Sequence, residues 1–209
     1  MEHANIADSE ESKHNKMWMV PMYRSLVFGE NYVKNVVAEL RIKKGDEVID
    51  FGCGTGKTAK ALCKKGISVH GIDIAENALN EEMHSKELFY FSKQCLWQLN
   101  SKVLDVDYAI CTNVMEQIPE KLVHAVLYQI AKKTLKAGFF AICTEQEALG
   151  PKHINQQLNV TVRSGRWWAD QLERYWDVTF AEDVNNLRTY LYYVKVRKDD
   201  NAEWKQRDR

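Results

Sequence analysis

A glycine-rich turn at the end of an apolar run constrains this chain more than any other feature. A buried strand is indicated by Val48-Ile49-Asp50-Phe51, and the turn that follows has a glycine at every second position, at Gly52, Gly54 and Gly56. Glycine lets the backbone turn tightly and lets a ligand approach without meeting a side chain. Residues 57–65 have helical composition, so the turn should open onto a helix N-terminus with free N–H groups. The pattern predicts a strand, a ligand-binding loop and a helix.

The spacing of the glycines separates this loop from a dinucleotide site. The dinucleotide fingerprint is G-x-G-x-x-G, whereas Lys57 stands at its sixth position here. Asp50, just before the first glycine, would repel a pyrophosphate but would suit an ammonium or sulfonium group. The acid-x-G-x-G-x-G pattern resembles the first motif of the class I S-adenosylmethionine-dependent methyltransferases. The alternative is a glycine-rich turn that binds no ligand.

A second acid follows the next β-rich run. Residues 67–74 end in Asp73-Ile74, about 20 residues beyond the first glycine, where a Rossmann-like sheet places a carboxylate against ribose hydroxyls. The resemblance identifies Asp73 as the ribose-binding acid, and Ile74 is expected on the adenine face. The alternative is an aspartate that only caps a helix starting near Ala75.

A third motif lies in the loop after the strand predicted at 107–112. Its sequence is Val114-Met115-Glu116-Gln117-Ile118-Pro119, similar to the Val-Leu-Glu-His-Ile-Pro pattern common in the family. Gln117 replaces the histidine and cannot exchange a proton near neutral pH, but it can orient a substrate by hydrogen bonds. The alternative for Glu116 and Gln117 is a polar loop without a function.

The resemblance and the motifs together give a set of candidate site residues. The candidate catalytic residues are Glu116, Gln117 and His153, of which only His153 could act as a base near neutral pH. His153 lies in a late loop, and a surface histidine is the alternative. The acid that many relatives carry after the third strand to hold adenine is missing from 92–97, where the backbone of Gln94 or Cys95 could replace it. The residues predicted to bind S-adenosyl-L-methionine are Asp50, Gly52, Cys53, Gly54, Thr55, Gly56, Asp73, Ile74 and Asn113.

The order of elements predicts the fold class. The expected elements are strand 46–51, helix 57–65, strand 67–72, helix 75–84, strand 87–92, strand 107–112, helix 119–136, which Gly138 would stop, and strand 138–144. This alternation predicts an α/β fold with helices on both faces of a mostly parallel sheet. The resemblance implies a Rossmann-like sheet of seven strands with an antiparallel C-terminal edge hairpin.

The two ends of the chain complete the predicted organisation. We expect a flexible segment over 1–16, a single domain over 17–197 and a charged tail over 198–209. A helix is predicted from about Glu30, a long loop over 145–159, a helix over 166–175, and strands at 178–181 and 187–196. The tryptophans of the late part are expected in the core: Trp167, Trp168 and Trp176.

Composition narrows the class of protein. The chain has 209 residues, 45% hydrophobic and 28% charged, with a formal net charge of zero, so the whole chain has no electrostatic attraction to nucleic acid. Five cysteines without metal-like spacing favour reduced thiols, no metal site and a cytoplasmic location. No apolar run approaches the length of a membrane span.

The resemblance implies transfer of a sulfonium methyl group, a reaction that needs alignment and exclusion of water more than a catalytic triad. Neither the N/D-P-P-Y/F signature of amino-directed DNA methylation nor a Pro-Cys pair occurs, which favours a small-molecule acceptor. The alternatives are a nucleic-acid or protein acceptor, and a protein that binds the cofactor without catalysis. The acceptor pocket is expected between the cluster at 17–23, the loop at Glu116-Gln117 and the loop around His153.

Overall fold

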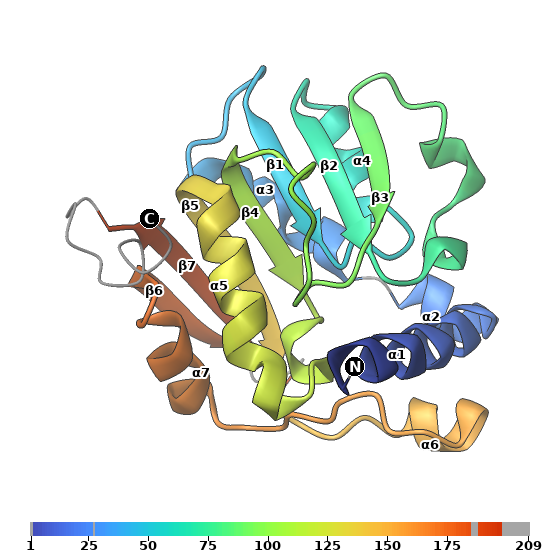
Figure 1. The fold of residues 1–209 in the computed structure, drawn as a ribbon. Helices are drawn as coiled ribbons and strands as arrows, with labels where there is room; N and C mark the ends of the chain where they lie inside the picture. Colours follow the sequence, from blue (N-terminus) through green and yellow to red (C-terminus); the bar gives the residue numbers. More distant parts are fainter. Residues whose placement is uncertain (1, 27, 185–187, 198–209) are drawn as a thin grey trace.

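A seven-stranded sheet forms the centre of the molecule (Figure 1). The computed structural model describes residues 2–26, 28–184 and 188–197. The spatial order of the strands is β3-β2-β1-β4-β5-β7-β6; β1 to β5 run parallel, and β7 runs antiparallel to both β5 and β6. The strands are β1 (Glu47–Phe51), β2 (Ser68–Asp73), β3 (Phe89–Lys93), β4 (Val106–Thr112), β5 (Thr134–Cys143), β6 (Trp176–Val184) and β7 (Thr189–Val196).

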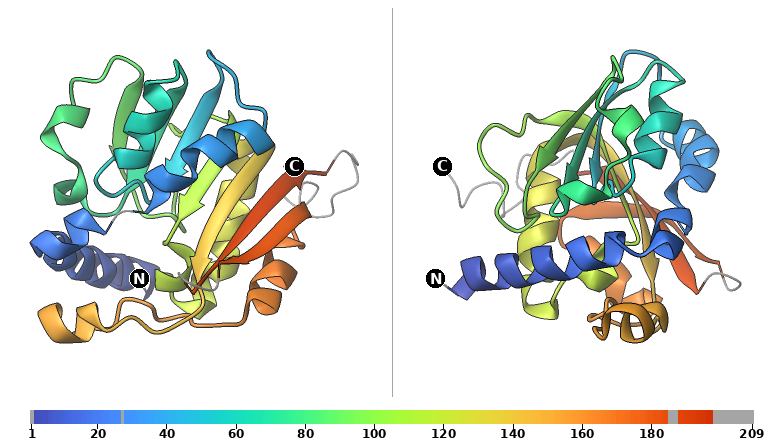
Figure 2. Two further views of the ribbon diagram at one scale, coloured as in Figure 1. Left: turned by 180° about the vertical axis from the view of Figure 1, so that it is seen from behind. Right: turned by 90° about the vertical axis from the view of Figure 1, so that its right-hand side faces the viewer.

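Helices cover both faces of the sheet, as Figure 2 shows from two further sides. One face packs against α3 and α4, and the other against α5 and α7. Helix α1 instead lies across the end of the sheet where β1 and β4 finish. The helices are α1 (Glu2–Trp18), α2 (Pro21–Ser25), α3 (Gly29–Glu39), α4 (Lys57–Cys63), α5 (Val123–Lys133), α6 (Leu149–Ile154) and α7 (Gly165–Leu172), with single 3₁₀ turns η1 (Glu76–Ala78), η2 (Glu81–Met83), η3 (Met115–Gln117) and η4 (Glu120–Leu122).

The predicted fold class is confirmed, down to the antiparallel strand inserted beside the parallel ones. The side chains of the last strand point alternately to the two faces of the sheet. Tyr192 and Val194 pack into the core on the α5 side, and Leu191 and Tyr193 pack on the α3 side. Both faces of β7 are therefore buried, as its position inside the sheet requires.

The helix predicted over 75–84 is wrong. Only η1 and η2 form, because Leu79 and Asn80 between them take extended backbone conformations. The side chains of Leu79 and Met83 pack where a β-carbon on Gly56 would lie, at 3.0 and 2.8 Å. Packing against the glycine loop therefore overrides helix propensity in this segment.

The end predicted for the long helix is also wrong. Helix α5 ends at Lys133, and Thr134 begins β5 with its hydroxyl donating to the carbonyl of Ile130 at 2.7 Å. Gly138 lies inside β5 rather than at a helix end. Its missing side chain lets β5 approach the Ala109 carbonyl on β4, which a β-carbon would meet at 3.3 Å.

The N-terminal segment also differs from its prediction, because residues expected to be flexible form α1. This helix is held by contacts to the β2–β3 side of the molecule: Lys93 pairs with Glu11 at 2.5 Å, and Asn77 donates to the Asn15 carbonyl at 2.9 Å. Met17 is buried at its C-terminal end. A polar helix of this kind has no strong pattern in sequence, since partners distant in the chain hold it. The tail predicted over 198–209 lies outside the described residues.

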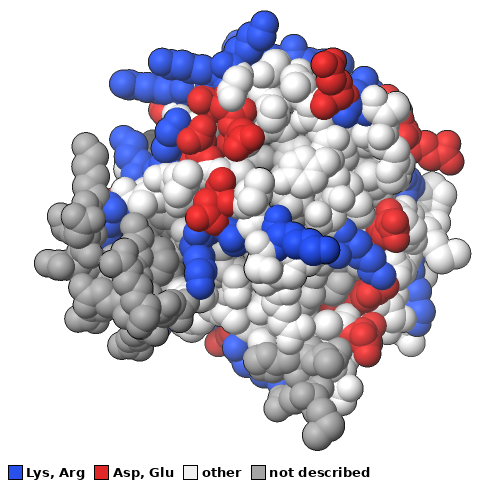
Figure 3. Space-filling model, turned by 45° about the horizontal axis from the view of Figure 1, so that its top comes forward, with Lys and Arg blue, Asp and Glu red and all other residues white. Residues whose placement is uncertain are grey.

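Charges of both signs are interspersed on the face drawn in Figure 3. Exposed ion pairs of this kind include Lys133 with Asp105 at 3.0 Å and Lys136 with Asp107 at 3.0 Å. Within the part of the chain that the structure describes, no helix is both long and apolar enough to cross a membrane.

Two neighbouring tryptophans provide a test of the core. Trp168 is fully buried beside α5, whereas Trp167 is half-buried against it. Trp168→Ala should lower the free energy of unfolding by about 3–5 kcal/mol because it leaves a large cavity. Trp167→Ala is the matched control and should lower the free energy of unfolding by clearly less. Equal shifts of the two urea midpoints would contradict this assignment of the core.

Candidate active site

A cavity of about 330 Å³ lies at the carboxyl ends of β1, β2 and β4, beneath α1. The strand order reverses between β1 and β4, which makes this edge the switch point where open α/β sheets bind ligands. The cavity is lined by segments far apart in sequence, from α1 and α2 to Thr189 at the start of β7.

The glycine loop forms one wall of the cavity. Gly52 and Gly54 have φ angles of +74° and +50°, in the left-handed region that favours glycine. A β-carbon on Gly54 would stand 2.8 Å from the indole ring of Trp18, and one on Gly52 would stand 2.3 Å from Val114. The loop therefore brings bare backbone to the cavity wall, and Trp18 of α1 covers it.

Asp73 connects this loop to β2. One carboxylate oxygen accepts a hydrogen bond from the Gly54 N–H at 2.8 Å, and the other accepts from the Ala75 N–H at 2.8 Å. Burial raises the pKa of Asp73, while the two N–H groups oppose that shift. Asp73 lines the cavity and also accepts from the amide of Ala75. The cavity position and the capping role, which were predicted as alternatives, therefore occur together.

Asp50 is the second carboxylate of this wall. It is 1% exposed, and its Oδ2 atom has no hydrogen-bond partner among the described residues. Burial, followed by the charge of Asp73, raises the pKa of Asp50 to about 7. A buried carboxylate without a partner is costly unless a donor or a cation reaches it. Asp50 therefore faces the cavity as an acceptor for a positively charged group.

The loop after β4 forms a neighbouring part of the wall, with Val114 against Gly52. Asn113 has a φ of +55°, and its N–H donates to the Ala141 carbonyl at 2.8 Å. The amide of Gln117 donates to the Asn113 carbonyl at 3.0 Å, which fixes the orientation of that side chain. Glu116 is 1% exposed; its Oε1 accepts from Asn113 at 3.4 Å and its Oε2 has no described partner. Burial raises the pKa of Glu116 to about 7.

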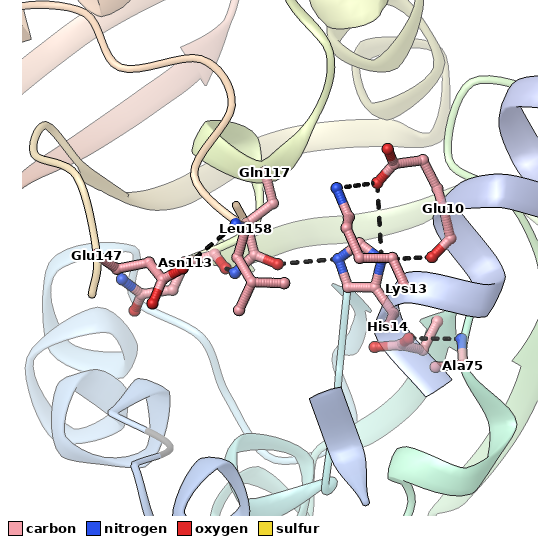
Figure 4. A network of polar contacts seen from close by, with 9 residues as sticks. Glu10, Lys13, His14, Ala75, Asn113, Gln117, Glu147 and Leu158 are labelled. Atoms are coloured by element: carbon pink, nitrogen blue, oxygen red, sulfur yellow. Dashed lines mark hydrogen bonds and ion pairs between the residues drawn. The ribbon is translucent and has the colours of Figure 1, made fainter. Parts of the chain in front are cut away.

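The structure adds a histidine that sequence reasoning missed. Figure 4 shows His14 reaching from α1 to the loop after β4, where its Nε2 lies 2.9 Å from the Gln117 Oε1. Its Nδ1 lies 2.8 Å from the Glu10 carbonyl. Both ring nitrogens therefore lie within hydrogen-bonding distance of an oxygen atom, which holds the imidazole between α1 and the loop after β4. Glu10 and His14 are one helical turn apart, and this spacing is the one feature of the segment's sequence that could have indicated His14.

His153 is not brought to the cavity. It lies exposed on α6 and does not line the cavity wall. The same segment contributes Glu147, whose carboxylate accepts from the N–H groups of Leu149, Gly150 and Leu158 at 2.7, 2.8 and 3.2 Å. These hydrogen bonds fix the start of α6, so the loop predicted over 145–159 contains a short helix and presents Glu147 rather than His153.

Most of the other predicted residues meet at the cavity. Thr55 and Gly56 are buried behind the wall, and Leu96 and Trp97 line the region where the sequence has no acid. No group of three or more His, Cys, Asp or Glu residues among those described could hold a metal ion. The predicted residues that line the cavity are Asp50, Gly52, Cys53, Gly54, Asp73, Ile74, Asn113, Glu116 and Gln117.

The burial of Asp50 predicts a pH-dependent stability. Its pKa rises from 3.8 to about 7 on folding, so the folded protein holds a proton that the unfolded chain has released. The free energy of unfolding of the ligand-free protein should therefore fall as the pH rises from about 4 to about 7, by about 4 kcal/mol from this group. Asp50→Asn should flatten that decline in urea titrations, and Asp105→Asn, at an exposed site, should not. An unchanged slope in Asp50→Asn would contradict the assignment.

Three comparisons with known proteins bear on the family. The chain is 29% identical over 118 residues to a ubiquinone biosynthesis O-methyltransferase of Azoarcus sp. (strain BH72), covering 47% of this chain and 49% of that protein. It is 31% identical over 70 residues to the S-adenosyl-L-methionine-dependent Diels-Alderase iliD of Neonectria sp. (strain DH2), covering 34% and 28%. The matches span about half or less of these curated relatives.

The fold is similar to that of the magnesium protoporphyrin IX methyltransferase ChlM from Synechocystis PCC 6803, solved with bound SAM. The TM-score is 0.64 at 18% identity, with 80% of this chain and 79% of that chain covered. At that identity the likeness concerns the fold alone. A family described as a methyltransferase domain matches residues 24–186, which include the glycine loop, Asp73 and the loop after β4. The chain belongs to this methyltransferase-domain family.

Proposed function

We propose that this protein is an S-adenosyl-L-methionine-dependent methyltransferase that acts on a small-molecule acceptor. The observation that carries the proposal is the pairing of the glycine wall with the buried carboxylate of Asp50, whose Oδ2 has no hydrogen-bond partner among the described residues. When bound, the cofactor supplies a methyl group already activated by a cationic sulfur. A pyrophosphate would be repelled by the two adjacent carboxylates, whereas a cationic cofactor is attracted by them.

The residues of the wall fit the parts of such a cofactor. Asp73 keeps accepting capacity on both oxygens for ribose hydroxyls, since each receives one described hydrogen bond. Ile74, Leu96 and Trp97 offer apolar surface for adenine. The indole N–H of Trp97 has no described partner, so it can donate to a ring nitrogen of the base.

Helix α1 excludes water from this site. Trp18 lies over Gly54, Met17 is buried in the cavity wall, and His14 hydrogen-bonds Gln117 on the far side. Exclusion of water strengthens the electrostatic interactions inside the site and prevents hydrolysis.

A small acceptor fits the enclosure of the cavity better than a polymer does. The formal net charge is zero, so the whole chain has no electrostatic attraction to a nucleic-acid acceptor. The five cysteines form no disulfide, in keeping with the proposed cytoplasmic location.

A protein that binds the cofactor without methyl transfer is the second candidate function. It is favoured by Gln117, which stands where relatives carry histidine, and by the relative named as a Diels-Alderase. Cofactor binding is common to both candidates, so only turnover separates them. Methylated product from any acceptor, detected by mass spectrometry, supports the first candidate.

Cofactor binding should raise the melting temperature. S-adenosylhomocysteine is expected to stabilise the protein because it binds only the folded state, and NADH is expected to have no effect. Asp73→Ala should weaken S-adenosylhomocysteine binding by about 1–3 kcal/mol in calorimetry, and Gly54→Val should weaken it further by displacing Trp18. Stabilisation by NADH alone would overturn the proposed cofactor.

The contact between α1 and the loop after β4 should control how long the ligand stays. His14→Ala removes the hydrogen bond to Gln117, so dissociation of S-adenosylhomocysteine should become faster in stopped-flow measurements. His153→Ala is the matched control, since that histidine is exposed and outside the cavity. Faster dissociation in His153→Ala but not in His14→Ala would show that the wrong histidine has been assigned.

A further inference from the structure

The charges that line the cavity are unbalanced. Five of the described lining residues are acids: Glu10, Asp50, Asp73, Glu116 and Glu147. None of the described lining residues is Lys or Arg. Lys13 compensates Glu10 at 2.6 Å, and the proposed cofactor accounts for Asp50 and Asp73. Glu116, in the loop after β4, and Glu147, in the segment before α6, remain.

The Glu116 carboxylate has fewer hydrogen-bond partners than the Glu147 carboxylate. It is almost fully buried, it lines the cavity, and its Oε2 has no hydrogen-bond partner among the described residues. Glu147, in contrast, has three N–H groups on its carboxylate, which hold it in place beside Leu158, as Figure 4 shows. The Glu116 Oε2 atom needs a hydrogen-bond donor from the ligand, because a buried acceptor without a hydrogen bond costs free energy.

Two tyrosines also contribute to the lining of the cavity. Tyr23 and Tyr32 line the cavity, and burial followed by the charge of Glu147 raises the pKa of Tyr23, so its phenol stays protonated. Aromatic faces attract cations, particularly where water is excluded. An alcohol could donate one hydrogen bond to Glu116, but only a cation also compensates the charge of two carboxylates.

We propose that Glu116, with Glu147 and Tyr23, forms an acceptor subsite for a small primary amine, which this protein methylates on nitrogen. The inference rests on the proposed function, whose cofactor binds at the glycine loop, Asp50 and Asp73. The ammonium ion gives one proton to the Glu116 carboxylate, which exposes the nitrogen lone pair. The nitrogen then forms a bond to the methyl carbon as the carbon–sulfur bond breaks and its electrons stay on sulfur. The product is a methylammonium ion that keeps one positive charge.

Three probes with one aromatic skeleton test the head group: phenethylamine, phenethyl alcohol and phenylacetate. Calorimetry with saturating S-adenosylhomocysteine should show phenethylamine binding at least about tenfold more tightly than either of the others. With S-adenosylmethionine, the amine should give an N-methylated product by mass spectrometry. Equal or tighter binding of the alcohol or the carboxylate, or binding of none of the three, would overturn the amine subsite.

A matched pair of variants assigns the effect to Glu116. Glu116→Gln should weaken phenethylamine binding about tenfold or more, because the amide cannot compensate an ammonium charge. Glu120→Gln, four residues away and exposed beside Arg163, should change nothing. Stabilisation by S-adenosylhomocysteine should survive in both variants. If S-adenosylhomocysteine did not stabilise the parent protein, the proposed cofactor would be rejected. If Glu116→Gln left the binding of phenethylamine unchanged, only the subsite would be rejected.

Discussion

The hydrogen bond from the Gly54 N–H to the Asp73 carboxylate is the contact on which the site depends. It joins the loop after β1 to the end of β2, and the second oxygen of Asp73 holds the amide of Ala75. Gly52 and Cys53 add N–H bonds to the Ile72 carbonyl at 2.7 and 3.0 Å. A loop fixed in this way presents backbone to the cavity with little freedom to collapse into it, which is the preorganisation that binding requires.

Burial of carboxylates is the cost of this arrangement. Asp50 and Glu116 both line the cavity; burial raises the pKa of each to about 7, and each has one oxygen without a hydrogen-bond partner among the described residues. Such groups weaken the ligand-free fold, but they become favourable contacts when a cationic ligand arrives. The site therefore gives up stability in the free protein for electrostatic attraction of its ligands.

The covering helix shows the limit of local patterns. Residues 2–18 carry no strong apolar stripe, yet α1 is held by Glu11, His14 and Asn15 through partners distant in sequence. The same limit explains why the sequence predicted His153 at the cavity, where the structure places His14 instead. Position in a loop predicted His153, but the hydrogen bonds of Glu147 turn that loop into α6 and leave the histidine outside the cavity.

The sequence by itself determined the sheet, the glycine loop and the positions of Asp50, Asp73 and Glu116, because strand periodicity and turn chemistry are local. Tertiary structure decided where the segment 75–84 breaks, since Leu79 and Met83 pack onto the space left by Gly56. It also decided which residues close the cavity, because no short-range rule pairs His14 with a residue 103 positions away. Spacing along the chain predicts the strand ends, whereas the cover over them depends on contacts that only folding creates.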